Sequence, residues 1–135
     1  MSHFTTMTTQ LTDTDALRAA LADAGYREIE VHGRPQPLYG YEGGKRADTA
    51  HVIVRREHVG RASNDIGFRR GNDGRFLAVI SDYDRAKHDE RWLGRLTARH
   101  AYHLTTKTLT AQGFDVVTEA AERDGTVRMV LRRFR

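Results

Sequence analysis

The sequence predicts an α+β fold in which two helices pack on one face of a mainly antiparallel sheet. Two stretches place apolar residues three and four positions apart, which is the spacing of an amphipathic helix. Between them, short segments alternate apolar with other residues, as half-buried strands do. Because two similar β-α-β halves follow each other, we expect a sandwich related to the ferredoxin-like architecture. The length of 135 residues suits one domain, so we assign residues 1–135 to a single domain.

The first two elements are a strand and a helix. Residues 2–11 are rich in threonine and contain phenylalanine, and both residue types favour a strand. Residues 12–25 carry the first helical apolar stripe. Thr12 or Thr14 is placed to cap the start of this helix, and Gly25 supplies the left-handed residue that ends it.

The middle of the chain is predicted to consist of short strands and loops. Residues 28–32 alternate as a short strand, and residues 33–49, which contain both prolines and four glycines, follow as a loop. Because long loops are usually functional or disordered, we expect this one to be mobile in the isolated protein. Residues 51–56 alternate again as a strand, and residues 57–64 are expected to form a loose connection.

Two hairpins are predicted, each with glycine and Asn or Asp in its turn, because these residues adopt the positive φ angles of tight turns. The first pairs residues 65–69 with 75–81 around Gly71-Asn-Asp-Gly74, and the second pairs residues 115–120 with 126–134 around Asp124-Gly125.

The longest periodic stretch predicts a helix from His88 or Asp89 to Gln112, ended by Gly113. Its buried side is expected to contain Trp92, Leu93, Leu96, His100, His103 or Leu104, and Ala111. The core is expected to pack leucines of both helices, Leu17, Leu21, Leu93 and Leu96, against the strand residues Val52, Val54 and Phe68.

Composition excludes several classes of function. The chain contains no cysteine, which excludes a disulfide scaffold, a thiolate zinc site, an iron–sulfur cluster and a cysteine nucleophile. No apolar stretch is long enough for a spanning helix, and residues 1–11 lack the apolar segment of a secretion signal. We therefore expect a cytoplasmic protein that does not act in a membrane.

Positive charge is concentrated in the central third of the chain. The net charge of the chain is +4, and residues 45–70 account for it with seven Lys and Arg against three Asp and Glu. A basic sheet edge could bind RNA or single-stranded DNA through its phosphates. The residues that would do so are Arg55, Arg56, Arg69 and Arg70. A solvated sheet face rich in arginine is the alternative interpretation, and the consensus of the RNA-recognition sheet is absent.

Histidines are the candidate metal ligands. His100 and His103 lie three positions apart on the predicted long helix and so share a face. His3, at the start of the first strand, would be a third ligand if that strand lies under the helix. The alternative is that His103 is a buried, hydrogen-bonded residue between helix and sheet. Because the metal-site motifs are missing, the sequence assigns no metal, no cofactor and no catalytic residue.

A series of short motifs, taken together and in this order, resembles a known family. The motifs are Ser2-His-Phe4, Tyr39-Gly-Tyr41, Ala47-Asp48, Val52-Ile-Val54, Asp65-Ile-Gly-Phe68, Ala101-Tyr-His103, Gln112-Gly-Phe114, Asp124-Gly125 and Leu131-Arg-Arg133. They resemble the Ycf35 / DUF1257 family over nearly the whole chain. The chain differs from the family pattern at residues 81–85, where the family usually carries tryptophan, and at residues 57–63, which are longer than usual.

The resemblance implies an accessory role rather than a reaction. The family has no assigned activity, and its occurrence near genes for AAA-type ATPases implies a protein-binding role beside such an assembly. The partner- or ligand-binding residues would then be His3, Tyr39, Tyr41, Lys45, Arg46, Asp65, Tyr102 and His103. Three functions stay open: a non-catalytic protein-binding module, a protein that binds RNA or single-stranded DNA, and a small metal- or ligand-binding protein that uses His3 and His103.

Overall fold

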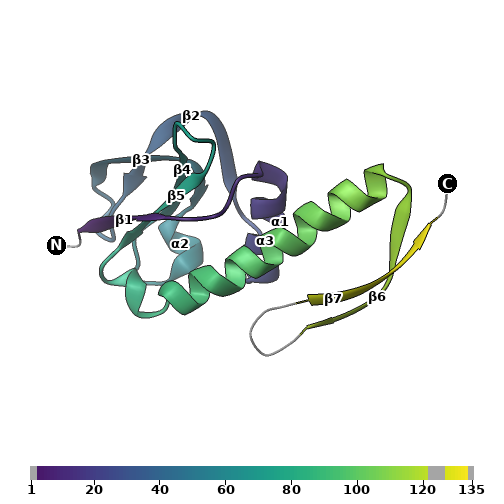
Figure 1. Cartoon of the computed structure of the whole chain (residues 1–135). Coiled ribbons are helices and arrows are strands. Elements are labelled where there is room, and N and C mark those ends of the chain that lie inside the picture. Colours follow the sequence, from purple (N-terminus) through teal and green to yellow (C-terminus); the bar gives the residue numbers. More distant parts are fainter. Residues whose placement is uncertain (1–2, 122–126, 134–135) are drawn as a thin grey trace.

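The computed structural model describes residues 3–121 and 127–133, whose elements are shown in Figure 1. In chain order they are β1 (Phe4–Thr8), α1 (Thr14–Asp23), β2 (Glu30–Tyr39), β3 (Lys45–Val54), α2 (Arg56–Val59), β4 (Ile66–Arg70), β5 (Phe76–Ser81), η1 (Asp84–Ala86), α3 (Glu90–Ala111), β6 (Phe114–Ala121) and β7 (Val127–Arg133). The α+β class and the order of the predicted helices and strands are confirmed, and the short helices α2 and η1 are added to them.

Five strands form one antiparallel sheet in the order β1-β5-β4-β3-β2. Strands β2 to β5 lie beside one another in chain order, with tight turns between β2 and β3 and between β4 and β5 and a longer connection containing α2 between β3 and β4. Strand β1 comes from the start of the chain and pairs with β5, with Phe4 opposite Ser81. The edges of the sheet are therefore β1 on one side and β2 on the other.

The two long helices cover one face of this sheet (Figure 1). One buried cluster contains all seven residues predicted to form the core: Leu17, Leu21, Leu93, Leu96, Val52, Val54 and Phe68. The opposite face carries a smaller cluster, which includes Leu38, Ala50 and Ile53. Gly67 is required there, because a Cβ atom at this position would lie 2.5 Å from the Cβ of Ala50.

The last two strands form a separate sheet of their own. The predicted hairpin is present as β6 and β7, with Phe114 opposite Arg133. Its predicted turn, Asp124-Gly125, lies outside the described residues. The hairpin folds back beside the second half of α3, away from the five-stranded sheet (Figure 1). The strands that follow α3 therefore do not join the main sheet, whereas β2 and β3, which follow α1, do.

The prediction of a loop over residues 33–49 is wrong. Strand β2 continues through Pro35 and Pro37, and β3 returns from Lys45, so the connection is a short turn over residues 40–44. Proline is tolerated in a sheet at edges and irregularities, since it lacks a backbone N–H. Strand β2 is an edge, and its register with β3 shifts between Val31 and Gln36 and again after Pro37.

The predicted cap of the first helix is also wrong. Asp13 caps α1, because its side chain accepts a hydrogen bond of 2.9 Å from the N–H of Ala16. Thr12 and Thr14, the predicted caps, flank it. A carboxylate is favoured at this position because it also interacts with the positive end of the helix dipole. Gly25 has a φ of +102°, which confirms it as the left-handed residue after the helix.

The long helix matches its prediction at both ends. Asp89 caps it through the N–H of Trp92, and Gly113 follows it with a φ of +94°. Its buried residues are Trp92, Leu93, Leu96 and His100. Ala111, which was expected on the buried side, is exposed, because the helix extends beyond the sheet at that end (Figure 1). The loose connection predicted over residues 57–64 includes most of α2.

Candidate functional site

Two motifs of the resemblance meet at the start of β4. The carboxylate of Asp65 is fully buried and accepts hydrogen bonds from the N–H of Tyr39 at 2.7 Å and the N–H of Arg56 at 2.7 Å. In return, the N–H of Asp65 donates to the carbonyl of Tyr39 at 3.0 Å. Asp65 therefore joins the ends of β2 and β3 to β4, and its side chain is sealed from any partner.

Arg55 extends this cluster toward the surface. Its guanidinium donates two hydrogen bonds to Glu30, at 2.6 and 2.8 Å, and a third of 2.8 Å to Asp65. The pairing with Arg55, assisted by His32 at 2.7 Å, lowers the pKa of Glu30 to about 2. The pKa of Arg55 is raised by the same carboxylates. Arg55 is therefore held in a fixed ion pair across β2, β3 and β4.

Two more of the four arginines proposed for nucleic acid bind groups within the protein. Arg56 donates to the carbonyl of Ser63 at 3.2 Å. Arg70 donates to the carbonyls of Thr12 and Gly74, at 2.9 and 2.7 Å, and lies 4.2 Å from the ring centre of Phe76. Arg69 is half-buried in β4, opposite Leu77. Arg56 and Arg70 therefore donate to backbone carbonyls of neighbouring loops.

A buried chain of hydrogen bonds begins beside the Asp65 cluster. The N–H of Tyr41 donates to the side-chain oxygen of Asn64 at 2.9 Å, and the amide nitrogen of Asn64 donates to the hydroxyl of Ser81 at 2.8 Å. Ser81 donates in turn to the carboxylate of Asp84 at 2.7 Å. Asn64, Ser81 and Asp84 are all buried. The stretch 81–85, where the chain departs from the family pattern, therefore supplies part of this internal network.

The network of hydrogen bonds continues to His88, whose ring packs against Tyr26, which follows α1, and against Trp92 of α3. Its Nδ1 lies 3.1 Å from the carbonyl of Asp84, and its Nε2 lies 2.5 Å from the hydroxyl of Tyr26. Since a carbonyl can only accept, Nδ1 carries the proton and Nε2 accepts from Tyr26. Burial lowers the pKa of His88, which favours this neutral form. The imidazole of His88 is therefore oriented by two fixed partners.

Three predicted binding residues are brought together at the turn between β2 and β3. Tyr41, Lys45 and Arg46 line a shallow hollow of about 90 Å³, with Asn64 at its base. Hydrogen bonding to Glu42 raises the pKa of the Tyr41 hydroxyl. Arg46 lies 5.9 Å from the ring centre of Phe4. This hollow is smaller than the pockets that hold ligands of drug size.

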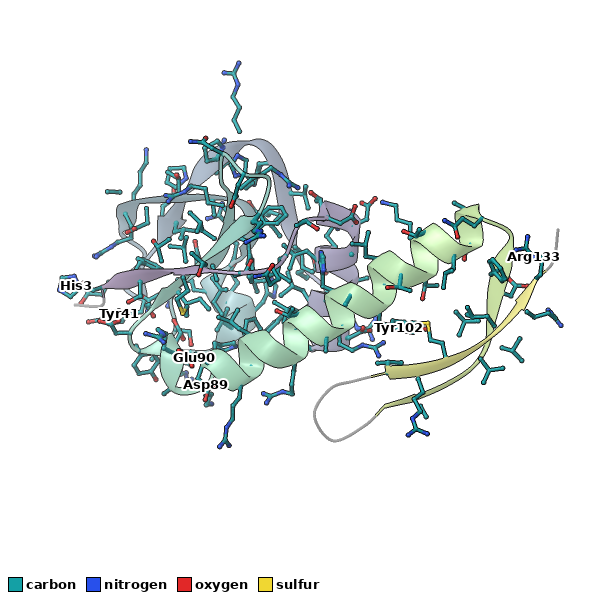
Figure 2. The ribbon with its side chains drawn as sticks, in the orientation of Figure 1. His3, Tyr41, Asp89, Glu90, Tyr102 and Arg133 are labelled. Carbon is teal, nitrogen blue, oxygen red and sulfur yellow. The ribbon has the colours of Figure 1, made fainter. Side chains whose placement is uncertain are left out.

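The structure does not bring His3 and His103 together. His3 is exposed and precedes β1, while His103 lies on α3 next to Tyr102. Figure 2 shows His3 at one end of the molecule and Tyr102 well apart from it, beside α3. Tyr102 lies against Arg99, whose guanidinium carbon is 4.4 Å from the ring centre. Within residues 3–121 and 127–133, no group of three or more His, Cys, Asp or Glu could hold a metal ion. A site shared by the two histidines is therefore not formed.

His100 and His103 bind different partners, although they share a side of the helix. The Nε2 of His103 lies 2.6 Å from the carboxylate of Asp23, which also accepts from Arg99 at 2.9 Å. The Nε2 of His100 accepts from the N–H of Asp13 at 3.1 Å and is 3.3 Å from the N–H of Thr12. Burial lowers the pKa of His100, so the neutral acceptor form is favoured. Both histidines join α3 to α1.

A groove beside β1 is the first feature that the sequence reading missed. It has a volume of about 1050 Å³ and runs between β1, the turn from β4 to β5, and the first half of α3. Its walls include Met7, Gly94 and Thr97. The sequence signal for this groove is that residues 4–8 contain no charged residue and no proline. Only the strand order shows that these residues form an edge of the sheet.

A second cavity lies between α1, α3 and β7, with a volume of about 540 Å³. Arg95 and Arg99 line it, and together with Arg91 they recur every four residues along α3. This spacing places the three arginines on one helix face and is visible in the sequence, although it is spread over three helical turns and does not form a contiguous basic segment.

The helices in the described part of the chain include none with the length and apolar character needed to cross a membrane.

The chain is similar to uncharacterised proteins over its full length. The family model described as "Protein of unknown function (DUF1257)" matches residues 20–130. The chain is 27% identical over 136 positions to a protein from Guillardia theta, covering all of this chain and 99% of the relative. It is 24% identical to a protein from Cyanophora paradoxa, with the same coverage of both chains. Both relatives are named uncharacterized protein ycf35. No solved structure matches significantly.

Proposed function

This chain belongs to the DUF1257 family, whose description gives no activity, and we propose from the structure that it is a protein-binding module. It takes up an extended segment of a partner protein, which adds to the sheet as a strand beside β1. The observation that carries this proposal is a sheet edge that is unprotected and lies next to a groove.

The two edges of the sheet differ in their protection against pairing. Natural proteins block exposed edges with proline, charge and irregular register. The β2 edge has Pro35, Pro37, the exposed Arg34 and two register shifts. Strand β1 consists of Phe, Thr and Met residues in regular register with β5 and has none of these features. The asymmetry supports β1 as the edge that receives a strand.

The register indicates which backbone groups of β1 point outward. His3 lies opposite Asp82, and the carbonyl of His3 accepts a hydrogen bond of 2.8 Å from the N–H of Asp82. Hydrogen-bonded and non-bonded pairs alternate in an antiparallel ladder. Thr5 and Met7 therefore bond to β5, while the N–H and C=O groups of Thr6 and Thr8 face the open side. Main-chain hydrogen bonds to these two residues would provide affinity for any extended peptide.

The helix wall of the groove leaves room for a second backbone. Glu90, Gly94 and Thr97 of α3 line the groove at helical spacings of four and three residues. Glycine within a helix costs about 1 kcal/mol relative to alanine. A Cβ atom on Gly94 would meet nothing within 4 Å, so contacts within the described protein do not require glycine. A closely approaching partner segment would make use of the missing side chain.

The groove indicates the chemistry of the partner segment. Met7 and Leu93 form its apolar part, which suits a small apolar side chain facing α3. Its charged lining residues are Asp73 and Glu90 against Arg75, so a Lys or Arg in the segment would be attracted. The partner is thus an extended, proline-free segment with one basic residue. An AAA-type ATPase, which the resemblance implied, is the first protein to search for such a segment.

The test uses Thr6→Pro with Thr6→Val as its matched control. Proline removes one outward N–H and leaves the bonds between Thr5 or Met7 and β5 intact. The probe is a displayed library of random peptides of about seven residues, close to the length of a strand. We expect enriched peptides to bind the unchanged protein and Thr6→Val with equal affinity. Thr6→Pro should weaken them at least about tenfold, the size expected for losing a main-chain hydrogen bond and its register.

Other outcomes would overturn the proposal. They are failure to enrich any peptide, equal binding by Thr6→Pro and Thr6→Val, and selection of peptides that leave the amides of Thr6 and Thr8 unprotected from hydrogen exchange. Retention on heparin that falls steeply with salt, in the absence of peptide binding, would support the nucleic-acid alternative instead. Far-ultraviolet circular dichroism of both variants is the control for folding.

A further inference from the structure

The cavity between α1, α3 and β7 shares no residue with the groove beside β1. Ala20 of α1 and Ala24 directly after it line one side, Trp92 and Leu96 of α3 line another, and Val127 of β7 completes the lining. Figure 1 shows how this comes about, since the terminal hairpin folds back along α3 toward α1. Its volume of about 540 Å³ is within the range of small-molecule sites.

The interior of the cavity is apolar and well fixed. Trp92 and Leu96 are both buried and belong to the main core, as does Ala20. Trp92 is held further by His88, whose ring centre lies 4.7 Å away in an edge-on arrangement. This wall is therefore preformed, and it suits the hydrocarbon or aromatic body of a ligand.

The rim of the cavity is positively charged. The charged residues that line it are Arg95, Arg99 and Asp23, with a net charge of +1. Arg99 uses its Nε for Asp23 and lies over the ring of Tyr102. The side chain of Arg95 is exposed, and its positive charge acts on the carboxylate of Asp89. The two guanidinium groups lie one helical turn apart on the same face of α3.

We infer that this cavity binds a small amphipathic carboxylate. The apolar body of the ligand lies against Trp92 and Leu96, and its carboxylate is held by Arg95 together with the remaining N–H groups of Arg99. Arginine is the residue best suited to this contact, because its planar donors match a carboxylate. An uncharged ligand of the same shape would gain no charge-assisted hydrogen bond from Arg95. This site is independent of strand addition at β1.

The only tryptophan in the chain makes the test direct. Because Trp92 lines the cavity, its fluorescence reports on an occupant without a label. We expect octanoate to change the emission of the full-length protein in a saturable way and 1-octanol to bind at least about tenfold more weakly, as a lost charge-assisted hydrogen bond predicts. Arg95→Gln should weaken octanoate by a similar factor and leave 1-octanol unchanged.

Arg91→Gln is the matched control, since Arg91 is exposed one turn before Arg95 and does not line the cavity. It should bind octanoate as the unchanged protein does. A fluorescence change that does not saturate, equal affinity for octanoate and 1-octanol, or equal weakening by the two substitutions would each overturn the inference. Thr6→Pro should bind octanoate normally, so failure at one site is distinguishable from failure at the other.

Discussion

Glu30 lies between two basic side chains, and this arrangement makes stability depend on pH in the acid range. The hydrogen bonds from Arg55, with a further one from His32, lower its pKa in the folded protein to about 2, against an ordinary value of 4.5. The folded state therefore holds its carboxylate ionised where the unfolded chain takes up a proton. The stability from this ion pair is complete above about pH 4.5 and is lost as the pH falls toward about 2.

We predict that Glu30→Gln lowers the free energy of unfolding at neutral pH and makes it vary less between about pH 4.5 and pH 2. The loss should be about 1 kcal/mol, because the Glu30 side chain is 39% exposed and water screens the ion pair. Urea unfolding at several pH values measures both effects. Glu28→Gln is the control on an exposed neighbour. An unchanged acid dependence in Glu30→Gln would contradict the prediction.

At the scale of elements, His100 fixes the start of α1 to the side of α3. Its Nε2 lies within 3.1 and 3.3 Å of the N–H groups of Asp13 and Thr12, at a helix start whose N–H groups have no helical partner. Protonation removes the lone pair that accepts them. Because burial lowers the pKa of His100 below the ordinary 6.5, the unfolded chain takes up this proton more readily. Stability from this contact is therefore present above about pH 6.5 and falls as the pH decreases.

We predict that His100→Gln reduces the loss of stability between about pH 7 and about pH 5. The glutamine oxygen can still accept an N–H, but the side chain does not titrate. Part of the dependence should remain, because burial lowers the pKa of His88 in the same way. Thermal unfolding at both pH values measures the difference. A variant that loses stability as steeply as the unchanged protein would show that His100 is not responsible.

At the scale of the whole molecule, one core joins both helices to the sheet. Leu96 is 2% exposed and contacts this core from the middle of α3. We predict that Leu96→Ala lowers the free energy of unfolding by ~2–5 kcal/mol, as core truncations do. Chemical denaturation measures this change. Leu131→Ala, at an exposed position in β7, is the control and should change the free energy by less than about 0.5 kcal/mol.

The fold was predictable to the extent that its signals are local. Apolar spacing located both long helices, and glycine with Asn or Asp located the hairpin between β4 and β5. The prolines of β2 led to the wrong prediction of a loop, because proline is tolerated in a strand when that strand lies at the edge of a sheet, and the sequence does not show the edge. Sheet order is decided by residues far apart in sequence, such as Phe4 and Ser81.

The candidate site was predictable only in part, and for the same reason. Asp65 and Tyr39 were both predicted as binding residues, and the carboxylate of Asp65 accepts a hydrogen bond from the N–H of Tyr39. It paired His100 with His103 from their spacing on the helix. In the structure, His100 accepts from the N–H groups of Asp13 and Thr12 at the start of α1. His103 meets the carboxylate of Asp23 in α1, which precedes it by 80 residues. A short spacing shows which side chains share a face, but not which atoms they meet.

The unequal edges of the sheet also determine how far an assembly can grow. A protein with two receptive edges can add copies on both sides and form a fibre. Here, if a partner strand occupies the β1 side as we propose, the other edge of the five-stranded sheet is β2, where Pro35 and Pro37 oppose further pairing. On this proposal, the five-stranded sheet accepts a strand at one edge and opposes pairing at the other. Such a sheet would favour complexes of defined stoichiometry over continued growth through this sheet.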